Sequence, residues 1–156
     1  MAIRRLETRD EAETEALGAR LAPSLPVVRL IYVRGPLGAG KTTFVRGLLR
    51  GLGHDEAVRS PTFTLVEPYR TGGVDLYHFD LYRLKDPEEL EFLGMRDYLG
   101  SDAVCVIEWP ERAGTVLPAP DIDVMIRPTN NQGRAVELRA HTQAGNAALA
   151  RVDEFE

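Results

Sequence analysis

A chain of 156 residues with 44% hydrophobic and 28% charged residues is long enough for one globular domain and too short for two ordinary ones. It holds no apolar run near the roughly 20 residues of a membrane helix and no apolar signal-peptide core, so we expect a cytoplasmic protein without a membrane partner. The net charge of −5 argues against a protein that grips bare RNA or DNA through its own surface, since neutralising phosphates needs clustered Lys and Arg.

The first predicted elements lead into a glycine-rich loop. Residues 8–11 (Thr-Arg-Asp-Glu) form a capping-box pattern, which predicts a helix from there to about Ala22, and the segment from Pro23 to Pro26 ends it. An apolar strand is expected over 27–34. This strand runs directly into Gly-Pro-Leu-Gly-Ala-Gly-Lys-Thr-Thr at 35–43, the pattern G-x-x-x-x-G-K-[ST] of a phosphate-binding loop.

The strand, the loop and the helix expected after it, to about Leu52, predict a nucleotide site. Glycines let consecutive backbone N–H groups turn inward around a phosphate. Lys41 offers a positive charge to the β- and γ-phosphates, and the Thr42 hydroxyl can ligate Mg²⁺ at the N-terminus of the helix. The residues assigned to nucleotide binding in this loop are Leu37, Gly38, Ala39, Gly40, Lys41, Thr42 and Thr43.

Two further elements follow the P-loop helix. Residues 63–69 and 74–82 are predicted as strands, joined by a Gly-Gly turn into a hairpin. Residues 86–94 predict a short helix with Asp86 as N-cap, proline in the first turn and Gly94 as the closing residue.

The last third of the chain is predicted to be mostly strand. The apolar run over 104–109 is typical of a central strand buried on both faces, and Cys105 within it is interpreted as a buried, unreactive thiol. Residues 121–127 and 135–140 predict a second hairpin, at a sheet edge. The tail from His141 has weak helical character at best.

These elements predict an α/β fold of the three-layer P-loop NTPase type. The expected sheet is central, mixed and largely parallel, with helices on both faces and antiparallel edge hairpins. We expect residues 1–156 to form a single P-loop ATPase domain, with 141–156 as a tail of uncertain order.

Two acidic residues are candidates for the second part of a nucleotide site, because a triphosphate with Mg²⁺ normally recruits at least one protein carboxylate. Glu108 is the first acid after four apolar residues, as expected of a carboxylate at the end of a strand beside the P-loop. Asp80 stands at the end of an earlier strand-like run, directly after Tyr-His-Phe at 77–79. Either acid can orient the attacking water or bind the metal, and the sequence leaves that choice open.

Three other features remain open or unassigned. Thr62, in the Ser-Pro-Thr segment at 60–62, is either a sensor of the γ-phosphate or part of an ordinary turn. Trp109 is either core or a lid beside Glu108. The sequence holds three histidines with no metal-ligand spacing between them, and no chemical role is assigned to them: His54, His78 and His141.

Five ordered blocks of this sequence resemble the TsaE (YjeE) family of bacterial P-loop ATPases. The blocks lie at 35–44, 60–69, 78–84, 86–90 and 106–110, and the likeness runs from about Thr8 to Arg139. The resemblance implies an ATPase needed to make threonylcarbamoyladenosine at position 37 of tRNAs that read ANN codons. It further implies that the protein binds and cycles a heterodimer of TsaB and TsaD, with tRNA reached only through that complex.

The resemblance also implies ATP and Mg²⁺ as ligands. Thr42, Glu108 and Asp80 would manage Mg²⁺ and the attacking water, and contacts on the adenine side would lie near Glu11 and Arg134. The expected chemistry is in-line attack of water on the γ-phosphate. No arginine finger can be assigned, and one supplied by a partner would make the protein slow alone.

Three alternatives share the same P-loop. A small-molecule kinase is the main one, but its usual Arg-rich lid is not evident in the short 110–118 segment, which holds one arginine. A GTP switch is disfavoured because the guanine-reading motif [NT]-K-x-D is missing. An assembly module that binds ATP without hydrolysis is harder to exclude.

Overall fold

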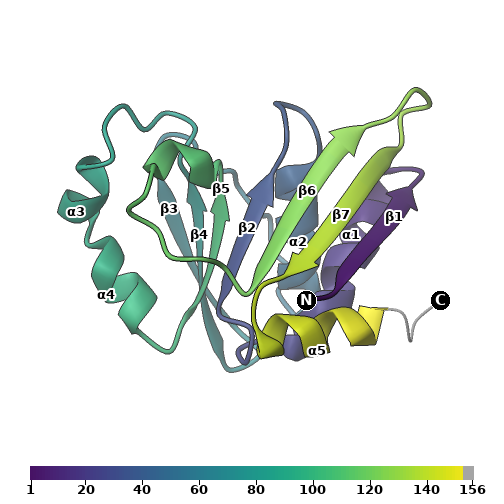
Figure 1. The fold of residues 1–156 in the computed structure, drawn as a ribbon, viewed down its shortest axis with the longest axis horizontal. Helices are drawn as coiled ribbons and strands as arrows, with labels where there is room; N and C mark the ends of the chain where they lie inside the picture. Colours follow the sequence, from purple (N-terminus) through teal and green to yellow (C-terminus); the bar gives the residue numbers. More distant parts are fainter. Residues whose placement is uncertain (153–156) are drawn as a thin grey trace.

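The computed structural model describes residues 1–152 and alternates strands with helices (Figure 1). In chain order the elements are β1 (Ile3–Thr8), α1 (Glu11–Leu21), η1 (Ala22–Ser24), β2 (Leu30–Arg34), α2 (Lys41–Gly51), β3 (Val66–Thr71), β4 (Val74–Asp80), α3 (Glu89–Leu93), α4 (Met95–Gly100), β5 (Val104–Glu108), η2 (Pro110–Ala113), β6 (Ile122–Pro128), β7 (Arg134–Ala140) and α5 (Gln143–Val152).

The strands form one mixed sheet in the order β1-β7-β6-β2-β5-β4-β3. The four central strands β6, β2, β5 and β4 run parallel to one another. At each side the sheet is completed by antiparallel pairs, β4 with β3 on one side and β6 with β7 and β1 on the other. The predicted α/β fold, with a mixed sheet and antiparallel hairpins, is confirmed.

Helices cover both faces of this sheet and divide the core in two. One apolar cluster joins α1, α2 and α5 to one face of the sheet. The other joins α3, α4 and η2 to the opposite face, over β5 and β4. The central strand β5 contributes to both clusters, and Cys105 on it is 1% exposed, as predicted. Burial raises the pKa of the Cys105 thiol to about 11, so the thiolate is scarce at neutral pH.

Helix α2, which begins at the P-loop, packs unusually closely against α1. A Cβ atom added to Gly47 would lie 2.0 Å from the carbonyl oxygen of Glu15, and one added to Gly18 would lie 2.3 Å from that of Phe44. Only hydrogen at these positions allows the two backbones to approach so far. The position of α2, and therefore of the P-loop, depends on this contact.

The N-terminal part of the chain differs from the prediction in two ways. The N-cap of α1 is Asp10, whose side chain accepts the Glu13 N–H at 2.9 Å, and not Thr8. Thr8 instead ends strand β1, which the sequence analysis did not predict and which pairs with β7 at the sheet edge. The predicted hairpin of β6 and β7 therefore lies inside the sheet and not at its edge.

Other boundaries also shift. Strand β2 starts at Leu30 and β3 at Val66, three residues after each predicted start, because turns occupy the residues before them. Gly94 closes α3, as predicted, and does so in a left-handed conformation, but a second short helix, α4, follows at once. The predicted N-cap at Asp86 is wrong, because α3 begins at Glu89 with Glu88 as its N-cap.

The prediction of weak helical character after His141 is wrong. Helix α5 packs Ala148, Leu149 and Val152 against the core of α1 and α2, so burial compensates for its modest intrinsic propensity. Residues 153–156 of the predicted tail lie outside the described residues. Within 1–152, no helix is both long and apolar enough to cross a membrane.

Candidate nucleotide-binding site

The loop between β2 and α2 has the backbone conformation that its glycines suggested. Gly38 and Gly40 have φ values of 76° and 103°, and Gly40 is the N-cap of α2. A Cβ atom at Gly38 would meet nothing within 4 Å, so glycine is needed there for the backbone conformation and not for space. The first backbone N–H groups of an 11-residue helix therefore face the loop, an arrangement that binds anions.

Lys41, the first residue of α2, lies at the floor of the loop. Its Nζ donates hydrogen bonds to the carbonyl oxygens of Gly35 at 2.8 Å and Pro36 at 2.7 Å, and lies 4.6 Å from the centre of the Trp109 ring. Burial lowers the pKa of Lys41, while the charges of Glu108 and Asp80 act in the opposite direction. Trp109 is therefore a wall of this site and not a core residue only.

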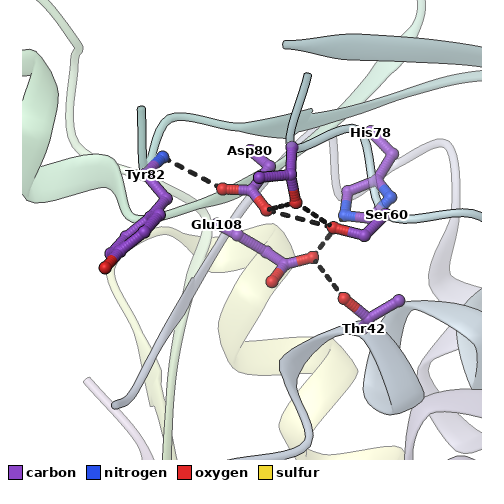
Figure 2. Close-up of polar contacts among 7 residues, drawn as sticks. Thr42, Ser60, His78, Asp80, Tyr82 and Glu108 are labelled. Atoms are coloured by element: carbon purple, nitrogen blue, oxygen red, sulfur yellow. Dashed lines mark hydrogen bonds and ion pairs between the residues drawn. The ribbon is translucent and has the colours of Figure 1, made fainter. Parts of the chain in front are cut away.

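Glu108 and Asp80 lie side by side because they end neighbouring parallel strands. Asp80 of β4 is paired with Glu108 of β5, and Glu108 is paired with Val33 of β2, so the three residues form a row across the sheet. Both carboxylates are buried, with exposures of 5% and 2%. The Thr42 hydroxyl donates to Glu108 Oε2 at 3.1 Å, which joins the P-loop to β5 (Figure 2).

The segment before β3 is held to Asp80. The hydroxyls of Ser60 and Thr62 lie 3.2 and 3.3 Å from Asp80 Oδ2, and the Tyr82 N–H donates to Oδ1 at 3.0 Å. Thr62 therefore contacts one of the two acids and lines the pocket, and its role as a sensor stays a prediction.

A histidine lies beneath the second acid. Nε2 of His78 is 2.6 Å from Glu108 Oε2, and the His78 side chain is fully buried. Because an ionised carboxylate only accepts hydrogen bonds, Nε2 is the donor. His78 and Thr42 reach the same oxygen of Glu108. Figure 2 shows that the other oxygen of Glu108 points away from both residues.

Every residue that the sequence assigned to nucleotide or metal binding lines one pocket of about 500 Å³. Glu11 lies at its rim and Arg134 reaches in from the start of β7. The Arg134 guanidinium donates to the carbonyl oxygens of Ala39 at 2.6 Å and Gly38 at 3.2 Å. The pocket is lined by Asp10, Glu11, Thr14, Leu37, Gly38, Ala39, Gly40, Lys41, Thr42, Thr43, Ser60, Thr62, Asp80, Tyr82, Arg83, Glu108, Trp109, Gln132 and Arg134.

The residues present fit a nucleotide with Mg²⁺. Mg²⁺ is usually bound through one or two carboxylates and the phosphates of its substrate, and a threonine hydroxyl with two buried acids supplies that set here. The described part of the chain holds no group of three or more His, Cys, Asp or Glu side chains that could bind a metal without such phosphates. The glycine loop and Lys41 supply donors to the phosphates.

Sequence reasoning missed two members of this site. His78 was passed over because it has no metal-ligand spacing, although its place two residues before Asp80 puts it on the same face of a strand. The sequence gives Ser60 no role beyond its place in the 60–69 block. Its contact with Asp80 joins residues 20 positions apart and has no local signal.

The chain is similar to proteins of one family. A family model described as threonylcarbamoyl adenosine biosynthesis protein TsaE matches residues 8–136. A Haemophilus influenzae protein named tRNA threonylcarbamoyladenosine biosynthesis protein TsaE is 53% identical over 121 residues, which are 78% of this chain and 76% of that protein. A Bacillus subtilis protein of the same name is 36% identical over 128 residues, 82% of this chain and 80% of that protein. A crystal structure of Bacillus subtilis YdiB has a TM-score of 0.82 at 27% identity and covers 99% of this chain and 96% of its own.

Proposed function

Because this chain belongs to the TsaE family and is thus a protein of tRNA threonylcarbamoyladenosine biosynthesis, we propose that it is a Mg²⁺-dependent ATPase of that pathway. In this proposal the protein associates with the TsaB–TsaD heterodimer in a nucleotide-dependent way. It contacts tRNA only as part of that complex.

One observation carries the ATPase proposal. The P-loop threonine and the two strand-end acids, which are far apart in sequence, meet at one end of the pocket, with Thr42 Oγ1 3.1 Å from Glu108 Oε2. A structural turn between a strand and a helix needs neither buried acid. Asp80 and Glu108 are only 5% and 2% exposed. Burying two carboxylates costs free energy, and binding a cation or acting on a reacting group would explain why the fold keeps them there.

Each residue has a role in this proposal. Lys41 and the N–H groups of the loop bind the phosphates, and Thr62 senses the γ-phosphate. Thr42 and Glu108, which contact each other, lie on the metal side, and Asp80 holds the segment with Ser60 and Thr62 and orients water. Bound Mg²⁺ would neutralise charge on the transferring phosphoryl group.

The arginines of the pocket support a partner-stimulated enzyme. Of the described arginines, Arg83 and Arg134 line the pocket. Arg134 is engaged with P-loop carbonyls, and the guanidinium carbon of Arg83 lies 4.4 Å from the centre of the Phe63 ring. Because Arg134 is engaged with the loop and Arg83 stacks on a ring, we propose that a partner supplies the arginine finger, and hydrolysis by the protein alone should be slow.

The test is phosphate release from ATP by the purified protein, alone and with the TsaB–TsaD heterodimer, with Glu108→Ala as the control. We expect the heterodimer to stimulate release in the wild type and not in the variant. Turnover that appears only when a metabolite acceptor is supplied would instead identify a small-molecule kinase. ATP binding with no release under either condition would identify an assembly module.

A further inference from the structure

We propose that His78 is a positioning residue for the nucleotide site: its Nε2–H holds one oxygen of Glu108 and thereby turns the other toward the pocket. The inference rests on the proposed function and deepens it. It assigns a role to a buried side chain of β4 that is not part of the pocket lining.

The strand geometry brings His78 to Glu108. His78 and Asp80 are two residues apart on β4 and so point to the same face of the sheet, the face on which Glu108 ends β5. His78 is paired with Val106, two residues before Glu108 and on the same face of β5, so its ring lies under the carboxylate. At 2.6 Å the His78–Glu108 hydrogen bond is shorter than the 3.1 Å bond from Thr42.

A histidine at this position lowers the stability of the fold, because its second ring nitrogen is left without a partner. Nδ1 of His78 is buried without a hydrogen-bond partner among the described residues. An unpaired buried polar atom destabilises a protein, because the desolvation of that atom is not compensated by a hydrogen bond. An apolar side chain of similar volume would fit the neighbouring core without that penalty, so the contact with Glu108 is what accounts for a histidine here.

The consequence for Glu108 is a fixed orientation. Oε2 accepts hydrogen bonds from His78 and Thr42 together, and the remaining oxygen is left for a metal-bound or attacking water. The Lys41 ammonium already experiences the charge of Glu108. Without the hydrogen bond from His78, this ammonium can draw the carboxylate away from its orientation toward the pocket. Residues that support metal ligands in this way typically change metal affinity or activity 10–100-fold when mutated.

Two conservative substitutions separate positioning from packing. The amide nitrogen of glutamine reaches the place of a histidine Nε2, whereas that of asparagine reaches only the place of Nδ1. We expect His78→Asn to weaken Mn²⁺ binding in the presence of ADP, followed by electron paramagnetic resonance, about 10-fold or more. His78→Gln should stay within about threefold of the wild type. ADP binding in EDTA should be unchanged in both.

The controls keep the inference separate from folding and from the proposed function. His54→Asn removes another histidine with an unpaired buried nitrogen, one that is not among the residues lining the pocket, and should leave Mn²⁺ binding unchanged. If His78→Asn fails to fold by urea unfolding, the apolar His78→Leu takes its place against His78→Gln. Equal Mn²⁺ affinity in donor and non-donor variants would overturn the role of His78. A wild type that binds no ADP would instead refute the nucleotide site itself.

Discussion

The ammonium group of Lys41 is the one lysine charge in the pocket. Lys41 as a residue is 5% exposed. Its ammonium group is held by the carbonyl oxygens of Gly35 and Pro36, so it is already positioned at the loop and loses little freedom when a phosphate binds. The other lysine of the described chain, Lys85, is exposed and outside the pocket lining. The two lysines therefore form a natural pair for a test.

We expect Lys41→Ala to weaken ATP binding about 10–100-fold, because a hydrogen bond to a charged group contributes roughly 1.5–3 kcal/mol. Isothermal titration calorimetry with Mg²⁺ and a slowly hydrolysed ATP analogue measures the change. Lys85→Ala removes the same charge from the surface and should leave affinity unaltered. Similar losses in both variants would mean that net charge, and not the P-loop contact, governs binding.

Helices α1 and α2 show how an element far from the phosphates determines the site. Their backbones touch at Gly18 and Gly47, and α2 carries Lys41 and Thr42 on its first turn. A wider separation of the two helices would tilt or shift the start of α2. Stability and nucleotide affinity should therefore respond together to volume added at this contact.

Gly47→Ala should destabilise the protein by about 1–3 kcal/mol or more through overpacking, even though alanine favours a helix over glycine by about 1 kcal/mol. The urea midpoint reports the loss and ATP titration reports the coupled fall in affinity. Gly100→Ala, at the end of α4 with nothing within 4 Å of the added Cβ, is the matched control and should be neutral or slightly stabilising. An unchanged midpoint for Gly47→Ala would show that α1 can move aside.

The elements that the sequence predicts best are those with local signals. The P-loop residues are contiguous, and the apolar run of β5 is typical of a strand buried on both faces. Strand β1, by contrast, exists because Ile3–Thr8 pairs with β7, more than 120 residues later, and α5 exists because small residues such as Ala148 find a partner surface on α1. The His78–Glu108 contact is of the same kind, since it joins residues 30 apart.

At the scale of the whole molecule, the distribution of charge agrees with the net value of −5. Arginines on the open face of β1, β2 and β7 are matched by acids: Arg5 and Arg139 contact Glu137, and Arg34 contacts Asp123. Such pairing cancels the field that a basic patch would need to attract phosphates over a distance.

The protein alone should therefore bind tRNA weakly or not at all at physiological salt. Fluorescence anisotropy of a labelled tRNA measures this, first with the protein alone and then with TsaB–TsaD added. Binding by the isolated protein tighter than about 1 μM, with a steep salt dependence, would contradict the prediction, because that range exceeds ordinary non-specific affinity.

The row formed by Val33, Glu108 and Asp80 has a further consequence for sequence divergence. Neighbouring strands lie about 4.7–4.9 Å apart, a spacing that backbone hydrogen bonds determine and side chains do not. The separation of the P-loop strand from the two acids is therefore independent of which apolar residues fill the core on either face. Many core residues can be exchanged for others of similar volume while the acids stay in place, so the chain can drift far in sequence and keep its site.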